Sequence, residues 1–516
     1  MADADRFIHG HGFSDALKRL ARTDPDRVYL RERHRAQTVA ELNRRVDAFA
    51  EALRRREIRA ESRVVLALDV GIDHVALIFA LLRIGSLWIP MNTQVRGEPL
   101  KHQLRDSRAD VIIAEANGAL VVNLPNTDFA EDIEIPDPGE LKLVVIPSAS
   151  ILDGSQRSNS AQTPADALDD ACLLMYTSGT TGPPKGALVS ETMLKAAVLG
   201  ALEVTEPRVG DVFYVWEPLF HIGGAQVVFL PLFCEITLAL VPKFSASRFW
   251  QDIVDFDVTH IHYLGGILQI LLQLPPVDEE THNRVRIAWG AGASPEIRDL
   301  CHSRYGFALH ECYGMTEASS ILTVNRNEST SGVGIPFPWI DISIGTFERE
   351  TEAPTEGEIR VRSRVEGLLT KGYLGNLDAT LKSRDGEWFK TGDLGYLDER
   401  GNLHFVGRGS DSIRVRGENV SAWQIESVFG LHPDVDRCAV IGVDAEVGEQ
   451  EMMLVITAAA SHRVKPQELL EWGRSQLAKF QVPRYLKVVS EMPITPSQRI
   501  AKHRLPRNVN SAFDAG

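Results

Sequence analysis

Apolar residues along this chain fall into short β-branched runs that alternate with longer, helix-like stretches. The first clear run is RVVLALDV at residues 63–70, and it is followed by an apolar helical stretch from Val75 that leads into another strand. The alternation continues as far as the strand ALHECYG, which follows the helical stretch SPEIRDLCHSRYG. Strands that alternate with helices predict largely parallel sheets covered by helices.

A different pattern begins after Ser331. The strands there are shorter and more antiparallel in character, as in GEIRVRS and in the hairpin YLDERGNLHFV, whose DERGN segment supplies turn residues. The polar segment GRGSD near residues 407–411 then separates this region from a last block with its own strands and helices. We therefore predict an α/β fold. A large N-terminal core domain of βα sheets plus a small β-barrel-like part spans residues 1–408, and a small mobile α+β C-terminal domain spans residues 409–516.

Composition and charge exclude several classes of protein. The 516 residues are 44% hydrophobic and 24% charged, as in a folded soluble protein, and the net charge of −15 would repel nucleic acids and anionic membranes. The longest apolar passage is interrupted by Arg83 and is shorter than a membrane span. The first residues lack the pattern of a secretory signal, so we expect a cytoplasmic protein. The five cysteines are scattered without CxxC spacing, which favours neither a disulfide framework nor a zinc site.

The segment YTSGTTGPPKG, at residues 176–186, combines glycines, hydroxyl side chains and one lysine. Glycines let backbone amides approach an anion, hydroxyls donate to phosphate oxygens, and Lys185 adds a positive charge. The segment does not match the GxxxxGK[ST] pattern of an ordinary P-loop. The alternative interpretation is a polar turn with a solvated lysine.

This segment resembles the phosphate loop of the adenylate-forming superfamily, which contains acyl-CoA synthetases, luciferases and the adenylation domains of peptide synthetases. The resemblance covers nearly the whole chain and is closest to the acyl-CoA synthetases. Five further motifs follow in the family's order: GAGAS (290–294), YGMTE (313–317), KTGDLG (390–395), GRGSDSIRVRGENV (407–420) and MPITPSQRIAKHRL (492–505).

The resemblance implies a role for each matching residue. Tyr313 would stack on adenine, Thr316 would donate to the α-phosphate, and Asp393 would accept hydrogen bonds from the ribose hydroxyls. Glu317 would ligate Mg²⁺, a hard cation that prefers oxygen ligands. Outside this family context, Tyr313 would be a core aromatic and Glu317 a surface charge. The full set expected to bind the nucleotide is Thr177, Ser178, Gly179, Thr180, Thr181, Gly182, Lys185, Gly290, Ala291, Gly292, Tyr313, Gly314, Thr316, Asp393 and Arg408.

The resemblance also implies a pocket for the acid that is activated. Its expected lining residues are His221, Gln226, Tyr263, Gly265, Trp289 and Ile321. His221 is in addition a candidate catalytic residue, although a lone histidine is more often structural. The other catalytic candidates are Lys185, Thr316, Glu317 and Arg499.

Arg499 marks a departure from the family pattern. The usual Gly-Lys pair of the last motif aligns here with Gln498 and Arg499. In the family this lysine contacts both the acid and the nucleotide while the adenylate forms. Arginine keeps the positive charge but is larger and fork-shaped, so the exchange is not conservative. Lys502 resembles a second basic position, and a register slip would be needed to bring it into the site.

The sequence therefore predicts an enzyme that uses ATP and Mg²⁺ to convert a small acid into its adenylate, releases pyrophosphate, and transfers the acyl group to coenzyme A. Two alternatives stay open: transfer to an amine, including a diazotase-type activation of nitrite, and a nucleotide-binding protein that has lost catalysis. Neither a nucleic acid nor a membrane is expected as a partner. A homodimer is the default expectation for the assembly.

Overall fold

The computed structural model describes most of the chain. The described residues are 2–93, 97–115, 131–133, 143–147, 170–177, 184–326, 331–345, 356–409, 412–415, 418–444, 450–459, 464–477, 481–494 and 499–515.

Among these residues the largest sheet has nine strands, with parallel strands in its centre and antiparallel pairs at its edges. Each central strand is followed by a helix or a loop that returns the chain to the start of the next strand. The order across the sheet is β16 (Ile335–Pro336), β15 (Ser320–Asn325), β14 (Ala308–Met315), β13 (Ile287–Ala291), β12 (His260–Leu264), β10 (Val212–Val215), β11 (Thr237–Leu240), β1 (Val28–Arg31) and β2 (Ala36–Thr38).

A second sheet has seven described strands and the same mixture of parallel centre and antiparallel edges. Its order is β6 (Glu131–Ile133), β7 (Leu143–Pro147), β5 (Val111–Glu115), β3 (Arg63–Ala67), β4 (Leu87–Pro90), β8 (Ala171–Thr177) and β9 (Lys185–Ser190). Side chains on β3 alternate between two cores: Val64 and Leu66 pack in one apolar cluster, Val65 and Ala67 in another. A strand buried on both faces reads as a continuous apolar run, which explains the sequence RVVLA.

Helices cover both faces of the two sheets. Helix α4 (Ile72–Ile84) is apolar over most of its surface and shares one large core with the inner faces of both sheets, as expected for a helix buried between two layers. Three helices also pack in that core: α2 (Phe13–Thr23), α3 (Val39–Arg55) and α8 (Glu191–Thr205). The outer face of the nine-stranded sheet packs against α10 (Phe249–Asp255), α11 (Gly265–Gln273) and α12 (Pro295–Tyr305), and α5 (Gly97–Ser107) packs on the seven-stranded sheet.

The later part of the chain forms smaller, mainly antiparallel sheets. One is built from β17 (Ile340–Gly345), β18 (Gly357–Ser363), β20 (Trp388–Leu397), β19 (Arg384–Asp385) and β21 (Leu403–Arg408), with α13 (Leu377–Lys382) beside it. A short hairpin, β22 (Ser412–Val415) and β23 (Glu418–Ser421), follows. The last sheet contains β24 (Val435–Asp444), β25 (Gln450–Ala458), β26 (Tyr485–Val488) and β27 (Phe513–Asp514) and packs against α14 (Ala422–Phe429) and α15 (Pro466–Gln476).

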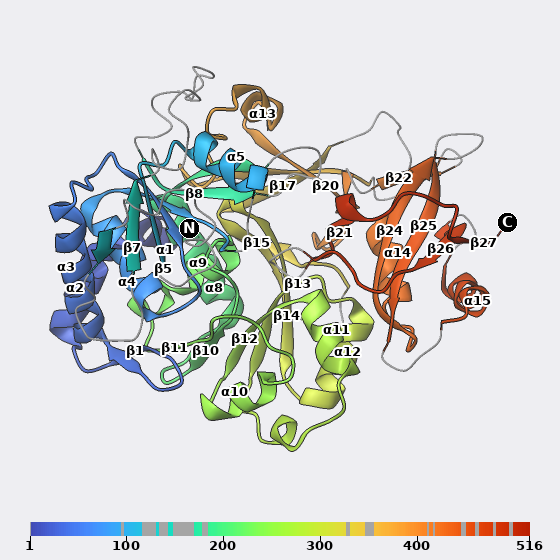
Figure 1. Ribbon diagram of the computed structural model, residues 1–516, viewed down its shortest axis with the longest axis horizontal. Helices are drawn as coiled ribbons and strands as arrows, with labels where there is room; N and C mark the ends of the chain where they lie inside the picture. Colours follow the sequence, from blue (N-terminus) through green and yellow to red (C-terminus); the bar gives the residue numbers. More distant parts are fainter. Residues whose placement is uncertain are drawn as a thin grey trace.

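The last sheet and its helices lie at one end of the molecule, and α2 and α3 lie at the other (Figure 1). This arrangement confirms the predicted fold: a large N-terminal part of βα sheets, a smaller antiparallel sheet, and a small α+β region at the C-terminal end. The boundary near residue 408 stays a prediction. Within the described residues, no helix has the length and apolar character needed to cross a membrane.

Candidate active site

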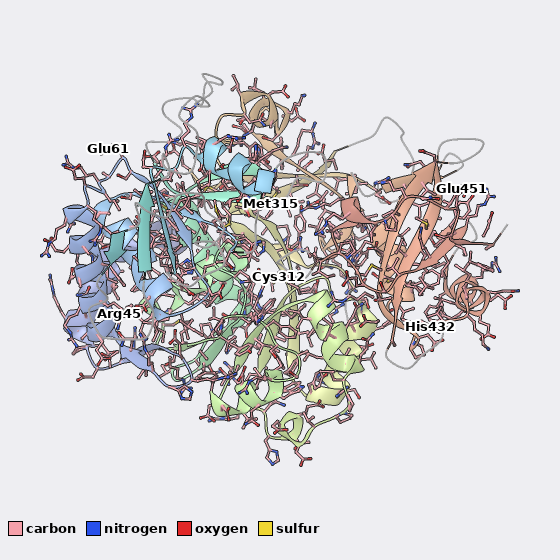
Figure 2. The ribbon with its side chains drawn as sticks, in the orientation of Figure 1. Arg45, Glu61, Cys312, Met315, His432 and Glu451 are labelled. Atoms are coloured by element: carbon pink, nitrogen blue, oxygen red, sulfur yellow. The ribbon has the colours of Figure 1, made fainter. Side chains whose placement is uncertain are left out.

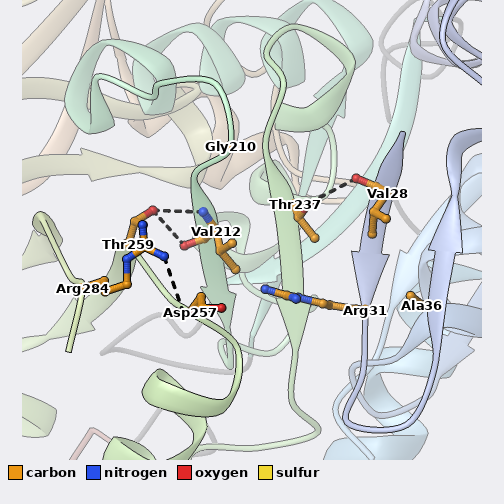
Figure 3. Close-up of a pocket in the computed structure, with 9 residues that line it drawn as sticks. All are labelled: Val28, Arg31, Ala36, Gly210, Val212, Thr237, Asp257, Thr259 and Arg284. Atoms are coloured by element: carbon orange, nitrogen blue, oxygen red, sulfur yellow. Dashed lines mark hydrogen bonds and ion pairs between the residues drawn. The ribbon is translucent and has the colours of Figure 1, made fainter. Parts of the chain in front are cut away.

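Two cavities lie at opposite ends of the strands of the nine-stranded sheet. The smaller, about 360 Å³, lies where β1, β10 and β11 begin and is lined by Val28, Val212 and Thr237 among others (Figure 3). The larger, about 700 Å³, lies where β12, β13 and β14 end. Open α/β sheets bind their ligands at the carboxyl ends of the strands, so the larger cavity is the candidate site.

The larger cavity collects residues that are far apart in the sequence. Cys312 and Met315 on β14 line it near the middle of the molecule (Figure 2). The site residues expected from the sequence that also line it are Thr177, Lys185, His221, Gln226, Trp289, Gly290, Ala291, Tyr313, Gly314, Thr316, Glu317, Ile321, Asp393, Arg408 and Arg499.

Three residues that were expected to line the site, Tyr263, Gly265 and Gly292, do not line the larger cavity. Tyr263 is buried on the opposite face of β12, because side chains alternate along a strand, and its hydroxyl donates to Glu311. Gly265 begins α11 and packs against the loop after β13, where a Cβ would lie only 1.9 Å from the carbonyl oxygen of Gly292. Gly292 belongs to the same loop and does not line the cavity. Ser178, Gly179, Thr180, Thr181 and Gly182 lie outside the described residues.

Glu317 stands in the cavity with two neutral hydroxyl groups as donors. It lies in a short 3-10 helix directly after β14 (Thr316–Ala318). Its Oε1 accepts hydrogen bonds from Thr177 Oγ1 at 3.3 Å and from Tyr373 OH at 2.9 Å, and the Lys185 ammonium lies 5.2 Å from the centre of the Tyr373 ring. These hydrogen bonds to the carboxylate come from neutral hydroxyl groups, and its oxygens are of the kind that Mg²⁺ prefers, so this environment fits Mg²⁺.

Within the described residues no group of three or more His, Cys, Asp or Glu side chains could hold a metal ion. A magnesium ion held at Glu317 would need further oxygen ligands, which nucleotide phosphates and water can supply. Mg²⁺ in phosphate-transfer sites is usually held in this way.

Asp393 is a buried acceptor between two donors. It lies on β20 opposite Arg408 on β21, whose Nε is 3.4 Å from Oδ1, while Tyr313 OH donates to Oδ2 at 2.8 Å. Burial raises the pKa of Asp393, and Arg408 and the Tyr313 hydroxyl only partly oppose that shift. The pair of adjacent carboxylate oxygens suits the recognition of two neighbouring hydroxyls, as on a ribose.

Arg499 reaches the cavity from the C-terminal part of the chain. Its side chain is exposed to the open cavity, so water reaches the guanidinium although protein surrounds it. The surrounding protein lowers its pKa, as does Arg408, while Glu217 and Asp393 act in the opposite direction. Arginine nonetheless keeps its charge in proteins. Lys502 does not line the cavity, and its ammonium lies 2.9 Å from Glu426 Oε1.

The end of the cavity that contains His221, Gln226 and Trp289 is called the acid end, after the expected pocket for the acid, and it contains two residues that the sequence did not indicate. Glu217 follows β10, and His262 lies near the end of the neighbouring strand β12. Their Oε2 and Nδ1 atoms are 2.8 Å apart. The sequence carried no clear signal for this pair, because the two residues lie in separate segments and the pairing of β10 with β12 cannot be read from either segment alone.

Comparison with known proteins identifies the family. The model of the AMP-binding enzyme matches residues 17–374, and that of the AMP-binding enzyme C-terminal domain matches residues 424–499. The chain belongs to the AMP-binding enzymes. The predicted membership of the adenylate-forming superfamily is thereby confirmed.

Curated relatives of this AMP-binding enzyme are acid–CoA ligases. A feruloyl-CoA synthase of Amycolatopsis sp. is 32% identical over 517 residues, which cover 97% of this chain and 99% of the relative. A 2-succinylbenzoate–CoA ligase of Geobacillus sp. (strain WCH70) is 29% identical over 507 residues, covering 96% and 98%.

Solved structures share the fold. The o-succinylbenzoate CoA synthetase of Bacillus subtilis, in complex with its acyl-adenylate intermediate, has a TM-score of 0.80 at 24% identity and covers 96% of this chain and 99% of its own. An anthranilate CoA ligase in complex with anthranoyl-AMP has a TM-score of 0.81 at 21% identity, with 96% of each chain covered.

Proposed function

We propose that this AMP-binding enzyme activates a small carboxylic acid with ATP and transfers the acyl group to coenzyme A. The observation that carries the proposal is the convergence of Lys185, Glu317, Asp393 and Arg499 on one cavity. These residues span more than 300 positions of the sequence and come from four different segments. The relatives support coenzyme A as the acceptor, because both are named as CoA ligases or synthases.

The reaction has two steps. An acid oxygen attacks the α-phosphorus of ATP and pyrophosphate leaves; the thiol of coenzyme A then attacks the acyl carbon and AMP leaves with the electron pair of the broken C–O bond. The first step brings two anions together, and the positive charges of Lys185, Arg408 and Arg499 offset their repulsion. Magnesium at Glu317 would supply further positive charge to the phosphate oxygens. Asp393 would hold the ribose.

His221 has the chemistry to orient the acid. Burial lowers its pKa, Arg499 lowers it further, and Glu217 opposes both shifts, so the imidazole is neutral near pH 7. Its Nε2 is buried and has no hydrogen-bond partner within the described residues. A neutral imidazole can donate one hydrogen bond to an acid oxygen without competing with Arg499 for its charge.

The test is acid-dependent exchange of pyrophosphate into ATP. We expect Arg499→Ala to lower exchange about 100-fold or more, as the loss of a charge-stabilising donor commonly does, and Arg499→Lys to recover part of it. Lys502→Ala is the matched control and should retain most of the exchange, because Lys502 lies outside the cavity. Pyrophosphate exchange at the wild-type rate in Arg499→Ala would reject the role of Arg499. It would favour a register shift of this segment that brings Lys502 into the site.

Direct measurements can test the acceptor of the acyl group, the assembly of the chain and its location. An amine acceptor, a homodimer and a cytoplasmic location stay predictions from the sequence. The enzyme would be incubated with ATP and a panel of carboxylic acids, and nitrite would be tested as an alternative acid. Coenzyme A and amines would each be added as the acceptor, and AMP release would be measured. The acceptor that raises AMP release separates a thiol acceptor from an amine. A protein that has lost catalysis would release no AMP in any of these mixtures.

A further inference from the structure

The acid end of the cavity contains buried polar atoms that no described residue satisfies. His221 Nε2 and Gln226 Oε1 are buried without a hydrogen-bond partner among the described residues, and both residues line the cavity. Glu217 and His262 line it as well, with Glu217 Oε2 and His262 Nδ1 paired at 2.8 Å. Gln226 is 1% exposed and Glu217 is 7% exposed. Leaving such groups unsatisfied costs about 1–3 kcal/mol each, so a ligand that accepts from His221 Nε2 and donates to Gln226 Oε1 is favoured.

Glu217 carries a negative charge in this position. Burial alone would raise its pKa, but His262, His221 and Arg499 outweigh that effect and hold the pKa below its usual value. An ionised carboxylate only accepts hydrogen bonds. His262 Nδ1 lies 2.8 Å from Oε2, and because a carboxylate oxygen has two lone pairs, Oε2 can accept a second hydrogen bond.

The surrounding residues fix this carboxylate in place. Gly223, in helix α9 (Ile222–Val227), lies against it so closely that a Cβ there would be 2.5 Å from Glu217 Oε2. On the other side, Trp216 Nε1 donates to the backbone oxygen of His262 at 2.7 Å, and the His262 ring lies 4.4 Å from that of Trp289. The charge is therefore built into the wall rather than carried by a flexible side chain.

A carboxylate that is fixed in the wall and can accept a further hydrogen bond distinguishes between substituents on the acid. An apolar tail would leave this acceptor unsatisfied, whereas a hydrogen-bond donor would use it. Resting on the proposed function, we infer that the acid this enzyme activates carries a hydrogen-bond-donating amino or hydroxyl substituent, which binds Glu217 and the Gln226 amide. Glu217 is then a specificity-determining residue.

The rest of the acid end indicates which probes to use. Phe220, Trp289 and Ile321 line it, so aromatic and apolar surface surrounds the polar group. Substituted benzoates fit such walls. Their N-acylsulfamoyl adenosines mimic the adenylate and bind without any chemical step, so affinity can be measured whether or not the enzyme turns over.

The experiment measures dissociation constants by calorimetry for ortho, meta and para isomers bearing hydroxyl, amino or methyl groups. At the best ring position we expect the donor-bearing compound to bind about 10- to 100-fold more tightly than its methyl counterpart, as a hydrogen bond to a charged group allows. The hydroxyl and amino compounds separate the two sources of the donor. In Glu217→Leu the ratio should fall to about 3-fold or less, and in the isosteric Glu217→Gln it should fall only partly.

Two controls keep the result clear. The affinity for AMP should not change in any Glu217 variant, and Glu235→Gln, at an exposed acid outside the cavity, should leave every ratio unchanged. Equal binding of methyl and donor-bearing compounds at every position would overturn the inference, as would an unchanged ratio in Glu217→Leu. If the donor-bearing compounds bind more tightly as expected but no acid gives pyrophosphate release, the Glu217 subsite is upheld and the proposed activity is rejected. If acids are activated without any preference for a donor substituent, the proposed activity is upheld and the Glu217 subsite is rejected.

Discussion

At the scale of single residues, buried carboxylates in this protein differ according to the groups beside them. Glu217 has a lowered pKa because His262, His221 and Arg499 outweigh its burial, whereas burial dominates at Asp393 and raises its pKa. Glu217 can therefore act as a fixed charge, whereas Asp393 depends on Arg408 and the Tyr313 hydroxyl to favour its ionised, hydrogen-bond-accepting form. Side-chain type alone could not have separated these roles.

Glu311 provides a pH-dependent test at this scale. Its carboxylate accepts hydrogen bonds from Tyr263 OH and from the backbone amides of Gly292 and Ala293, and it thereby holds the loop after β13. Burial raises its pKa from 4.5 to about 7, and these hydrogen bonds only partly oppose the shift. The folded state therefore binds more protons than the unfolded state between about pH 4.5 and 7.

It follows that the stabilising contribution of this group is complete below about pH 4.5 and is lost as the pH rises through 7. We expect the melting temperature of the wild type, relative to Glu311→Gln, to fall between pH 5 and 8. The corresponding change in free energy of unfolding is at most about 3.5 kcal/mol, at about 1.4 kcal/mol per unit of pKa. Calorimetric scans at constant ionic strength measure it, with Glu235→Gln as the control. A difference that does not vary with pH would contradict the expectation.

At the scale of helices and strands, hydrophobic patterning predicted most elements but not their neighbours. The runs RVVLALDV and ALHECYG read as strands in the sequence; the first contains β3 and the second forms most of β14. The pairing of β10 with β12, with β11 on the other side of β10, depends on contacts that a pattern in one segment does not encode. Glu217 and His262 meet because of that pairing, so the sequence indicated the nucleotide motifs but not this polar pair.

The alternation of side chains along a strand explains why Tyr263, which was expected in the pocket, does not line it. The sequence placed Tyr263 in the pocket because it belongs to the right segment. In β12 the adjacent His262 faces the cavity, and Tyr263 faces the core beneath α11 and α12. A shift of one residue along a strand reverses the face, so a motif locates the strand more securely than it locates the side chain that lines the site.

Helix α3 offers a test of local stability that is separate from activity. Thr38 caps it: its hydroxyl accepts from the Glu41 amide at 3.3 Å, and Glu41 Oε2 accepts from the Thr38 amide at 2.8 Å. We expect Thr38→Ala to lower the free energy of unfolding by about 1 kcal/mol. Thr38→Ser keeps the cap and should be close to the wild type.

Turnover should not change in either variant, because neither Thr38 nor Glu41 lines the cavity and α3 lies at the far end of the molecule (Figure 1). Urea midpoints and steady-state kinetics on the same preparations measure the two properties. A clear loss of turnover in Thr38→Ala, with turnover retained in Thr38→Ser, would show that the stability of the helix and the activity of the site are coupled.

At the scale of the whole molecule, the net charge opposes the approach of an anion, whereas positive residues in the cavity favour its binding. The chain carries a net charge of −15, which disfavours the approach of ATP, whereas Lys185, Arg408 and Arg499 place positive charge inside the cavity. Among the described lining residues, Arg499 is the one that lies beyond residue 409. A bound adenylate would therefore touch both the N-terminal part and, through Arg499, the C-terminal part of the chain.

Amide hydrogen exchange tests this contact. We expect a tight-binding acylsulfamoyl adenosine to slow exchange in β14, which carries Tyr313, and also in the segment around Arg499 at residues 492–505. Slower exchange reports a higher free energy of local opening. In Arg499→Ala the protection of β14 should persist, because Tyr313 and Asp393 still hold the nucleotide, while the protection of residues 492–505 should be lost. Persistent protection of that segment in the variant would mean that other contacts, not Arg499, connect the C-terminal part to the bound ligand.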